Sequence, residues 1–337
     1  MKDKVSFTLG IDIGSYSVKC AEVSHEEGRP PKLQQVVRVL IPNASKEGAA
    51  EAFRQLFSKR SFSAKKLRVA VSGPALIIRR IQMPRLTYSE LKGAMRFEAE
   101  SHIPFPIDDC LLDFQILDET PDKKKMNVLL VAAKRDLVQQ RLQGVAAHGM
   151  DVELVDVDVF CVINAFEKLG ENSQGERVHG LLNIGHQGSS FAVIQDKLPF
   201  YVREIAVGGR EVTKALAQMQ GIPEPEAEKL KIENAPEVSS AVQKGLEPLM
   251  DELRHAVDYF ENESGESLRW IGLSGGGATA PVVSSLLSEE LGRTVSLWDN
   301  SKKLSVSESA DRELLAKHSG EFNVALGLAL RGVKQGK

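Results

Sequence analysis

The chain alternates between short apolar runs and longer stretches in which apolar residues recur at helical spacing. Short runs bounded by small or polar residues predict strands, whereas apolar positions three and four apart predict helices. The first part of the chain predicts a mixed sheet with covering helices. Its elements are strands over residues 5–11, 18–23, 32–40 and 67–71, and a helix over 48–57.

A second block of strands and helices begins near Met83. Its first helix is expected to run to about residue 102, and the prolines of the segment Ile103–Pro106 form a rigid turn that ends it. Strands over 110–117, 127–132 and 152–157 and a helix over 135–147 follow. We interpret residues from about 79 to 157 as a small β/α subdomain inserted into the first domain.

The polar segment that starts at Gly170 separates the two halves of the chain. After it come a strand over 200–205, a helix opened by Gly208 and Gly209, and a segment rich in helix formers from Glu224 to about Gly265. The last predicted helix, over 322–330, is expected to cross back and pack on the first domain.

One short pattern occurs in both halves. Asp12-Ile13-Gly14 and Asn183-Ile184-Gly185 each follow an apolar run and lead through small residues into another. Each copy predicts a β-hairpin whose turn directs backbone N–H groups at one point, where a phosphate can bind. Either copy alone could be an ordinary tight turn, which selects Gly and Ser for backbone reasons. The pair favours a clamp on one polyphosphate.

A third turn is rich in glycine. Gly275, Gly276 and Gly277 follow a strand expected over 268–273 and precede a helix expected over 280–291. Bare backbone at such a turn lets a ring or a ribose lie close, and the helix N-terminus adds partial positive charge. In this order, two hairpin loops and a glycine turn resemble the nucleotide-binding parts of the actin-like ATPase superfamily.

Composition agrees with a globular protein that can form two domains. The chain has 337 residues, of which 42% are apolar and 26% are charged. A formal charge of −3 gives no electrostatic reason to expect nucleic-acid binding. The three cysteines, Cys20, Cys110 and Cys161, lie far apart in apolar surroundings and are expected to be buried thiols. Without a signal-peptide core or a membrane-spanning run, we expect a cytosolic protein with no direct membrane insertion.

The inserted block carries the most specific pattern. Phe97-Glu98-Ala99-Glu100, closed by Ile103-Pro104-Phe105-Pro106, resembles the type IV pilus assembly protein PilM family, a relative of the division protein FtsA. The likeness covers nearly the whole chain. It implies an α/β, two-domain actin-like (ribonuclease H-like) fold with an inserted β/α subdomain in the first domain. Domain I would comprise residues 1–170 and about 315–337, and domain II residues 176–314 with a helical subdomain over about 216–264.

The resemblance also implies a site for ATP and Mg²⁺. Asp12 would hold the magnesium ion through water, and Asp158 would lie near the γ-phosphate. These two residues are therefore the candidate catalytic residues, with Asp12 also the metal ligand. The candidate nucleotide-binding residues are Gly14, Ser15, Ser17, Lys19, Asn183, Gly185, Gly188, Ser189, Gly209, Glu228, Lys231, Gly275, Gly276 and Gly277.

Two positions depart from the superfamily pattern. Asn183 replaces the usual aspartate of the second loop, and Asp158 is one methylene shorter than the expected glutamate. Loss of one negative charge near a magnesium ion removes on the order of a few kcal/mol of attraction at an effective dielectric constant of about 20. Many backbone contacts to phosphate would remain, so we expect nucleotide binding with slow or absent hydrolysis.

The resemblance implies a scaffold on the cytosolic face of the inner membrane that binds the N-terminal tail of a PilN-like bitopic membrane protein. It leaves contact with the pilus motor ATPase and self-association open. A small-metabolite kinase and an FtsA-like cytoskeletal protein are the alternatives, because one fold serves many functions. A kinase needs an acceptor pocket with a catalytic carboxylate, and the sequence identifies none.

The tail is expected to lie extended along the seam between the inserted block and the first domain. Ile103, Phe105 and Ile107, beside Met95 and Phe97, are the candidate partner-binding residues because a groove needs exposed apolar side chains. The alternative is that these residues fill the core of the small subdomain.

Overall fold

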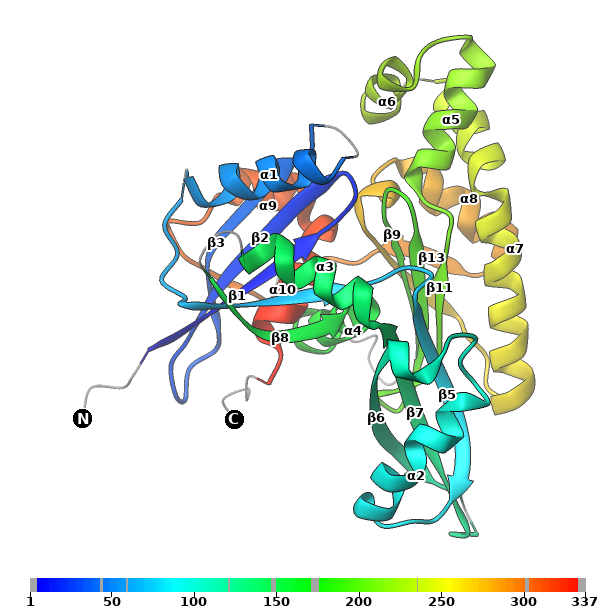
Figure 1. Ribbon diagram of the computed structural model, residues 1–337. Helices are drawn as coiled ribbons and strands as arrows, with labels where there is room; N and C mark the ends of the chain where they lie inside the picture. Colours follow the sequence, from blue (N-terminus) through cyan, green and yellow to red (C-terminus); the bar gives the residue numbers. More distant parts are fainter. Residues whose placement is uncertain are drawn as a thin grey trace.

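The computed structural model describes residues 5–42, 45–58, 60–120, 122–146, 150–170, 176–234, 236–300 and 303–332. Two α/β units lie side by side, and a smaller lobe extends from the base of the molecule (Figure 1). Each unit is a sheet with helices on its faces, which matches the two halves expected from the sequence.

The first unit contains a six-stranded sheet. Its strands are β1 (Ser6–Ile13), β2 (Ser17–His25), β3 (Lys32–Leu40), β4 (Lys66–Val71), β8 (Asp151–Val157) and β14 (Ser305–Val306), in the order β14-β3-β2-β1-β4-β8. Helices α1 (Lys46–Ser58) and α3 (Arg135–Ala146) cover one face, while α4 (Asp158–Leu169), α9 (Arg312–His318) and α10 (Asn323–Leu330) pack on the other side.

The apolar alternation of β1 explains how both faces are covered. Leu9 and Ile11 are fully buried in the core that includes α1. Gly10 lies on the opposite face, where an added Cβ would stand 2.1 Å from the carbonyl oxygen of Ala325 in α10. The return of the last helix to the first sheet, expected from the sequence, therefore depends on a glycine at this contact.

The second unit repeats the arrangement of the first. Its strands are β9 (Val178–Ile184), β10 (Ser189–Gln195), β11 (Leu198–Ile205), β12 (Trp270–Ser274) and β13 (Thr294–Leu297), in the order β11-β10-β9-β12-β13. In both sheets the first strand of an antiparallel hairpin also pairs with a later parallel strand, β1 with β4 and β9 with β12. The short sequence repeat thus marks a repeat of whole-sheet topology.

Helices α5 (Gly209–Gln220), α6 (Glu224–Ile232), α7 (Val238–Ser264) and α8 (Pro281–Leu291) belong to the second unit. Apolar side chains of α5, α7 and α8 form one core with the second sheet. The other face of that sheet contributes Leu181, Ala192 and Ile194 to a core shared with α4. Helix α4 therefore lies between the two sheets and couples their positions.

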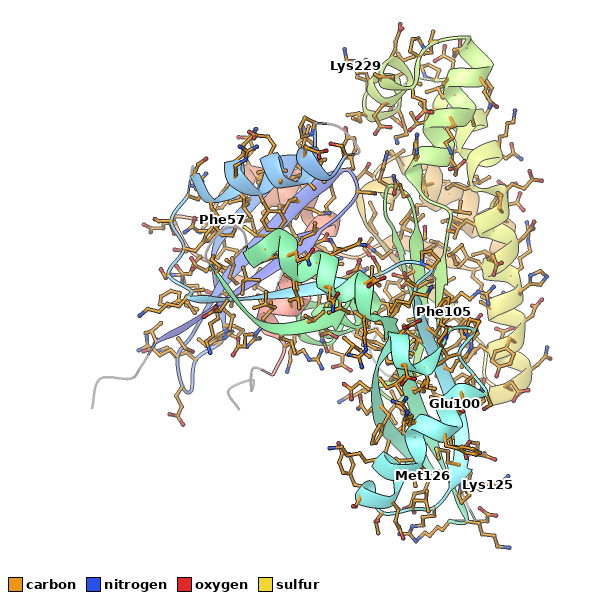
Figure 2. The ribbon with its side chains drawn as sticks, in the orientation of Figure 1. Phe57, Glu100, Phe105, Lys125, Met126 and Lys229 are labelled. Carbon is orange, nitrogen blue, oxygen red and sulfur yellow. The ribbon has the colours of Figure 1, made fainter. Side chains whose placement is uncertain are left out.

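The smaller lobe is a three-stranded sheet with one helix. Its strands β5 (Leu76–Pro84), β6 (Cys110–Glu119) and β7 (Lys125–Lys134) have the order β5-β7-β6, and α2 (Tyr88–Glu100) covers one face. Thr87 and Glu90 form a reciprocal capping box at the start of α2. Figure 2 places Met126 within this lobe, where its side chain is buried in the core.

The sheets draw two boundaries differently from the sequence. Strand β8 pairs with β4 of the first sheet, so the separate three-stranded sheet ends at Lys134 and not near residue 157. Helix α3 carries the chain from the small lobe back to the first sheet, where β8 pairs parallel to β4. Parallel strands need a crossover connection of this kind. Strand β14 pairs with β3 from Ser305, ahead of the return expected near residue 315.

Candidate functional site

A cavity of about 920 Å³ lies between the two units. That volume is typical of a site for a small molecule or cofactor. Every residue that the sequence assigned to nucleotide, metal or catalysis lines this cavity: Asp12, Gly14, Ser15, Ser17, Lys19, Asp158, Asn183, Gly185, Gly188, Ser189, Gly209, Glu228, Lys231, Gly275, Gly276 and Gly277.

The two hairpin turns are closed by the same backbone hydrogen bond. In the first, the Gly14 N–H donates to the carbonyl oxygen of Ser17 at 3.1 Å, and in the second the Gly185 N–H donates to that of Gly188 at 2.9 Å. An added Cβ at Gly185 would stand 2.7 Å from the Gly188 oxygen, so a side chain does not fit there. Gly14 and Gly185 thus leave bare backbone at the start of each turn, on the wall of the cavity.

The glycine turn packs directly on the second hairpin. Gly275 has a φ of 91°, and an added Cβ there would stand 2.3 Å from the carbonyl oxygen of Ile184. The Gly275 N–H donates to the carbonyl oxygen of Gly320 at 3.1 Å. Positive φ and the close approach both require glycine at this position. The sequence pattern of three glycines therefore reflects contact between two loops of the cavity.

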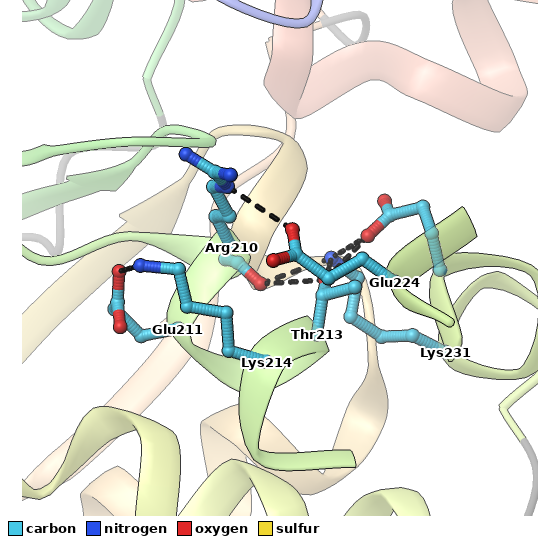
Figure 3. Close-up of polar contacts among 8 residues, drawn as sticks. Arg210, Glu211, Thr213, Lys214, Glu224 and Lys231 are labelled. Carbon is cyan, nitrogen blue, oxygen red and sulfur yellow. Dashed lines mark hydrogen bonds and ion pairs between the residues drawn. The ribbon is translucent and has the colours of Figure 1, made fainter. Parts of the chain in front are cut away.

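The start of α5 and the end of α6 form a polar network on the second unit (Figure 3). The Lys231 ammonium donates to the Gly209 carbonyl at 3.0 Å, to the Thr213 hydroxyl at 2.8 Å and to the Glu228 carboxylate at 2.7 Å. Burial lowers the pKa of Lys231, and the neighbouring Glu228 carboxylate opposes that shift. Glu228 and Lys231 are thus held at the cavity wall as a pair.

The first unit brings an ion pair and a second carboxyl into the cavity. Lys19 Nζ lies 2.7 Å from Asp12 Oδ2, because the two residues face each other across β1 and β2. Asp158 is the first residue of α4. Burial raises the pKa of Asp158 to about 6, with the negative charge of Asp12 as the next cause, while a hydrogen bond from Ser72 opposes the shift.

Several cavity residues were not identified from the sequence. Glu204 in β11 lines the cavity, and its Oε2 accepts a hydrogen bond from the Gly73 N–H at 3.1 Å. Burial raises the pKa of Glu204 to about 8, with Asp158 as the second cause. The available signal was a carboxylate one residue before the buried end of a largely apolar strand. Tyr16 and His186 were also missed, and their ring centroids lie 5.0 Å apart, so the two hairpin turns touch.

The end of the cavity near the glycine turn holds a charged cluster from the first unit. Arg38 Nε lies 2.8 Å from Glu321 Oε2, and His318 Nδ1 lies 2.7 Å from Glu321 Oε1. An added Cβ at Gly276 would stand 3.5 Å from the Glu321 carboxyl. This cluster therefore connects the first sheet to the glycine turn, a role that the sequence did not indicate.

The structure corrects the expected exposure of the partner-binding candidates. Ile103 and Ile107 are only 7% and 9% exposed and belong to the core of the small lobe, as does Met95. Phe105 is half-buried, with Lys134 Nζ 4.2 Å from its ring centroid. Phe97 is 78% exposed, because the buried face of α2 carries Leu91, Met95 and Ala99 at four-residue spacing. The alternative of a core role thus describes Ile103, Ile107 and Met95.

The donor set of the cavity fits a magnesium–nucleotide complex in part. Asp12 and Asp158 supply hard oxygen donors, and Lys19 supplies a positive charge beside them. In the described ranges, no three His, Cys, Asp or Glu side chains are grouped closely enough to hold a metal ion. Phosphate oxygens and water would have to complete the coordination, which is usual for Mg²⁺. Of the helices described, none could span a membrane.

Comparison with solved structures agrees with this architecture. A chain of a PilM-PilN type IV pilus biogenesis complex is similar to this one, with a TM-score of 0.85, 27% identity and coverage of 97% of this chain and 99% of that chain. The ethanolamine utilization protein EutJ from Carboxydothermus hydrogenoformans has a TM-score of 0.55 and 16% identity, with coverage of 98% and 91%. A nucleotide-free diol dehydratase-reactivating factor has a TM-score of 0.55 and 9% identity, with coverage of 96% and 99%.

These likenesses confirm the expected two-domain actin-like fold. The family model described as type IV pilus assembly protein PilM matches residues 10–333. That match spans both hairpins, the inserted lobe and the glycine turn. The chain belongs to the type IV pilus assembly protein PilM family.

Proposed function

We propose that this protein is a nucleotide-binding scaffold of a type IV pilus inner-membrane platform, which binds the cytosolic N-terminal tail of a PilN-like membrane protein. The observation that carries the proposal is the similarity over 97% of the chain to a protein solved as a PilM-PilN complex. Peripheral association with the inner membrane would follow from that partner. The kinase alternative is not favoured by the family match.

The cavity supports ATP with Mg²⁺ as the ligand. Backbone N–H groups of the two hairpin turns would hold the phosphates, and Lys19 would add a point charge. Glu228 and Lys231 would contact the ribose, and the bare backbone of Gly275–Gly277 would accommodate the base. When bound, Mg²⁺ would neutralise phosphate charge, and Asp12 would orient its water shell.

Turnover is expected to be slow. Asn183 accepts a hydrogen bond from Ser274 at 3.2 Å and brings no charge to the second loop. The pKa of about 6 at Asp158 suits a general base near neutral pH. The carboxyl is nevertheless one methylene shorter than in the superfamily pattern, and a base must reach the water that it activates. We therefore assign the nucleotide a structural role in holding the two units together.

The partner tail would bind where the small lobe meets the first unit. Phe105 is the most accessible of the three candidate residues, and Figure 2 places it at the end of the lobe nearest the two units. Displacing the Lys134 ammonium from the Phe105 ring would expose an apolar anchor for an extended peptide.

Calorimetry with a synthetic PilN-like tail peptide, with and without ATP and Mg²⁺, tests the scaffold. We expect Phe105→Ala to weaken peptide binding roughly 10-fold or more, as loss of an interface anchor does. Phe97→Ala is the matched control, because Phe97 is exposed on the far face of α2. A Phe105→Ala variant with lower thermal stability but unchanged peptide affinity would place the groove elsewhere. Failure of every such tail to bind the wild-type protein would remove the scaffold's mechanism.

A further inference from the structure

A row of polar residues crosses the second sheet at the cavity. Glu204 in β11 lies opposite Ser190 in β10, Ser190 lies opposite Asn183 in β9, and Asn183 lies opposite Ser274 in β12. Residues directly opposite each other on neighbouring strands project from the same face of a sheet. Glu204, Ser190 and Asn183 all line the cavity.

Two atoms of this row lack partners although they are buried. Within the described residues, neither the Ser190 hydroxyl oxygen nor Glu204 Oε1 has a hydrogen-bond partner, and the Ser190 residue is only 4% exposed. Other polar atoms of the row have hydrogen-bond partners. The Ser274 hydroxyl donates to the Asn183 side-chain oxygen, and the Gly73 N–H donates to Glu204 Oε2. Buried polar atoms without partners are rare and costly, so these two are expected to bind something in the cavity.

The first unit brings a carboxyl close to the same place. Ser72 donates to Asp158, and the next residue, Gly73, donates to Glu204 from its backbone. Two adjacent residues therefore hold one carboxyl from each unit. Along the row, Glu204 lies two strands away from Asn183, with Ser190 between them.

We propose that Ser190 and Glu204 form the second-unit half of a site for the hydrated magnesium ion of the bound nucleotide. With the cation bound beside it, Glu204 would ionise and supply the negative charge that Asn183 lacks. Ser190 would donate a hydrogen bond to the ion's water shell or accept one from it. Contact through water agrees with the lack of a direct metal cluster among the described side chains. This inference depends on the proposed nucleotide function and extends it to two unassigned residues.

The test is calorimetric titration of the full chain with ATP, once with Mg²⁺ and once with a chelator. The measured quantity is the ratio of the two affinities. Glu204→Gln preserves an acceptor for the Gly73 N–H and removes only the charge. We expect this variant to lower the ratio roughly 10- to 100-fold, as loss of an outer-shell partner of a metal does. Ser190→Ala should lower the ratio by a smaller factor.

Glu263→Gln is the matched control, because Glu263 is exposed on α7, and its ratio should equal that of the wild type. Electron paramagnetic resonance of bound Mn²⁺ gives a second readout, in which Glu204→Gln should loosen the ion. If Glu204→Gln does not fold, Ser190→Ala decides. A wild-type chain that binds ATP equally with and without Mg²⁺ overturns the inference, as do unchanged ratios in both variants. If the wild type binds no nucleotide at all, the proposed function itself fails.

Discussion

The two halves of the cavity share their backbone and differ in their charges. Both hairpin turns close with the same N–H to carbonyl hydrogen bond, at 3.1 and 2.9 Å. The first hairpin places the Asp12–Lys19 ion pair behind its turn, whereas the second has the neutral residues Asn183 and Ser190 at the corresponding paired positions. In this row of the second sheet the carboxyl lies instead two strands away from Asn183, at Glu204. A duplicated fold therefore preserves the hydrogen bond that closes each turn, while the position of the charged residues differs between the two sheets.

The largest effect is expected from a substitution that disturbs the backbone of the glycine turn in the second half of the cavity. Gly275→Ala forces a side chain into a φ of 91° and against the carbonyl oxygen of Ile184. We expect a loss of roughly 3 kcal/mol in the free energy of unfolding, measured by denaturant titration, because overpacking and backbone strain add. Gly73→Ala provides the control, since it also has positive φ but has open space around it. Equal losses in both variants would show that loop packing is unimportant.

The charge of Glu204 should appear as a pH dependence of stability in the absence of nucleotide. The pKa of Glu204 is raised from 4.5 to about 8 in the folded protein. The protonated carboxyl therefore contributes stability that is fully present below pH 4.5 and is lost as pH rises to about 8. Asp158 and the Gly73 N–H are the groups that face it. Glu204→Gln should therefore gain on the order of 3 kcal/mol over the wild type between pH 5 and about pH 8, measured by denaturant titration. A constant difference across that range would contradict this.

Removing the charge of the first half is expected to act on nucleotide binding. Lys19→Ala deletes the ammonium beside the first turn and leaves Asp12 without its partner. We expect nucleotide affinity to fall by about 2 kcal/mol, a factor of roughly 30, because hydrogen bonds to charged groups contribute that much. Calorimetry measures the loss, and Lys229→Ala on the exposed face of α6 is the control. An unchanged affinity would mean that the phosphates do not lie at the first turn.

The smallest effect is expected from giving the second hairpin a carboxylate at the position that corresponds to Asp12 in the first. Asn183→Asp restores a carboxylate next to the Ser274 hydroxyl. We expect the Mg²⁺ dependence of nucleotide affinity to rise by about 1 kcal/mol and ATP turnover to increase several-fold, because another negative charge attracts the metal ion. Phosphate release measures the turnover. A decrease in both quantities would indicate that the charge of Glu204 already saturates this half of the site.

The sequence by itself determined the elements that depend on local pattern. The two hairpins, the glycine turn and the strand and helix periodicities follow from residues near one another in the chain, and they also carried the family resemblance. The residues they assigned to the nucleotide line one cavity because the loops that carry them are fixed by the sheet topology.

Only the tertiary structure decided which distant residues meet. Glu204 joins the site because the Gly73 N–H of the first unit donates to its carboxylate, and no local pattern encodes a contact between residues so far apart in the chain. Ile103 and Ile107 are buried and Phe97 is exposed because the small sheet covers one face of α2, which makes apolar character alone a poor guide to a docking surface. Likewise, β8 and β14 pair with β4 and β3 of the first sheet. The sequence did not show this, because these partners are far from them in the chain.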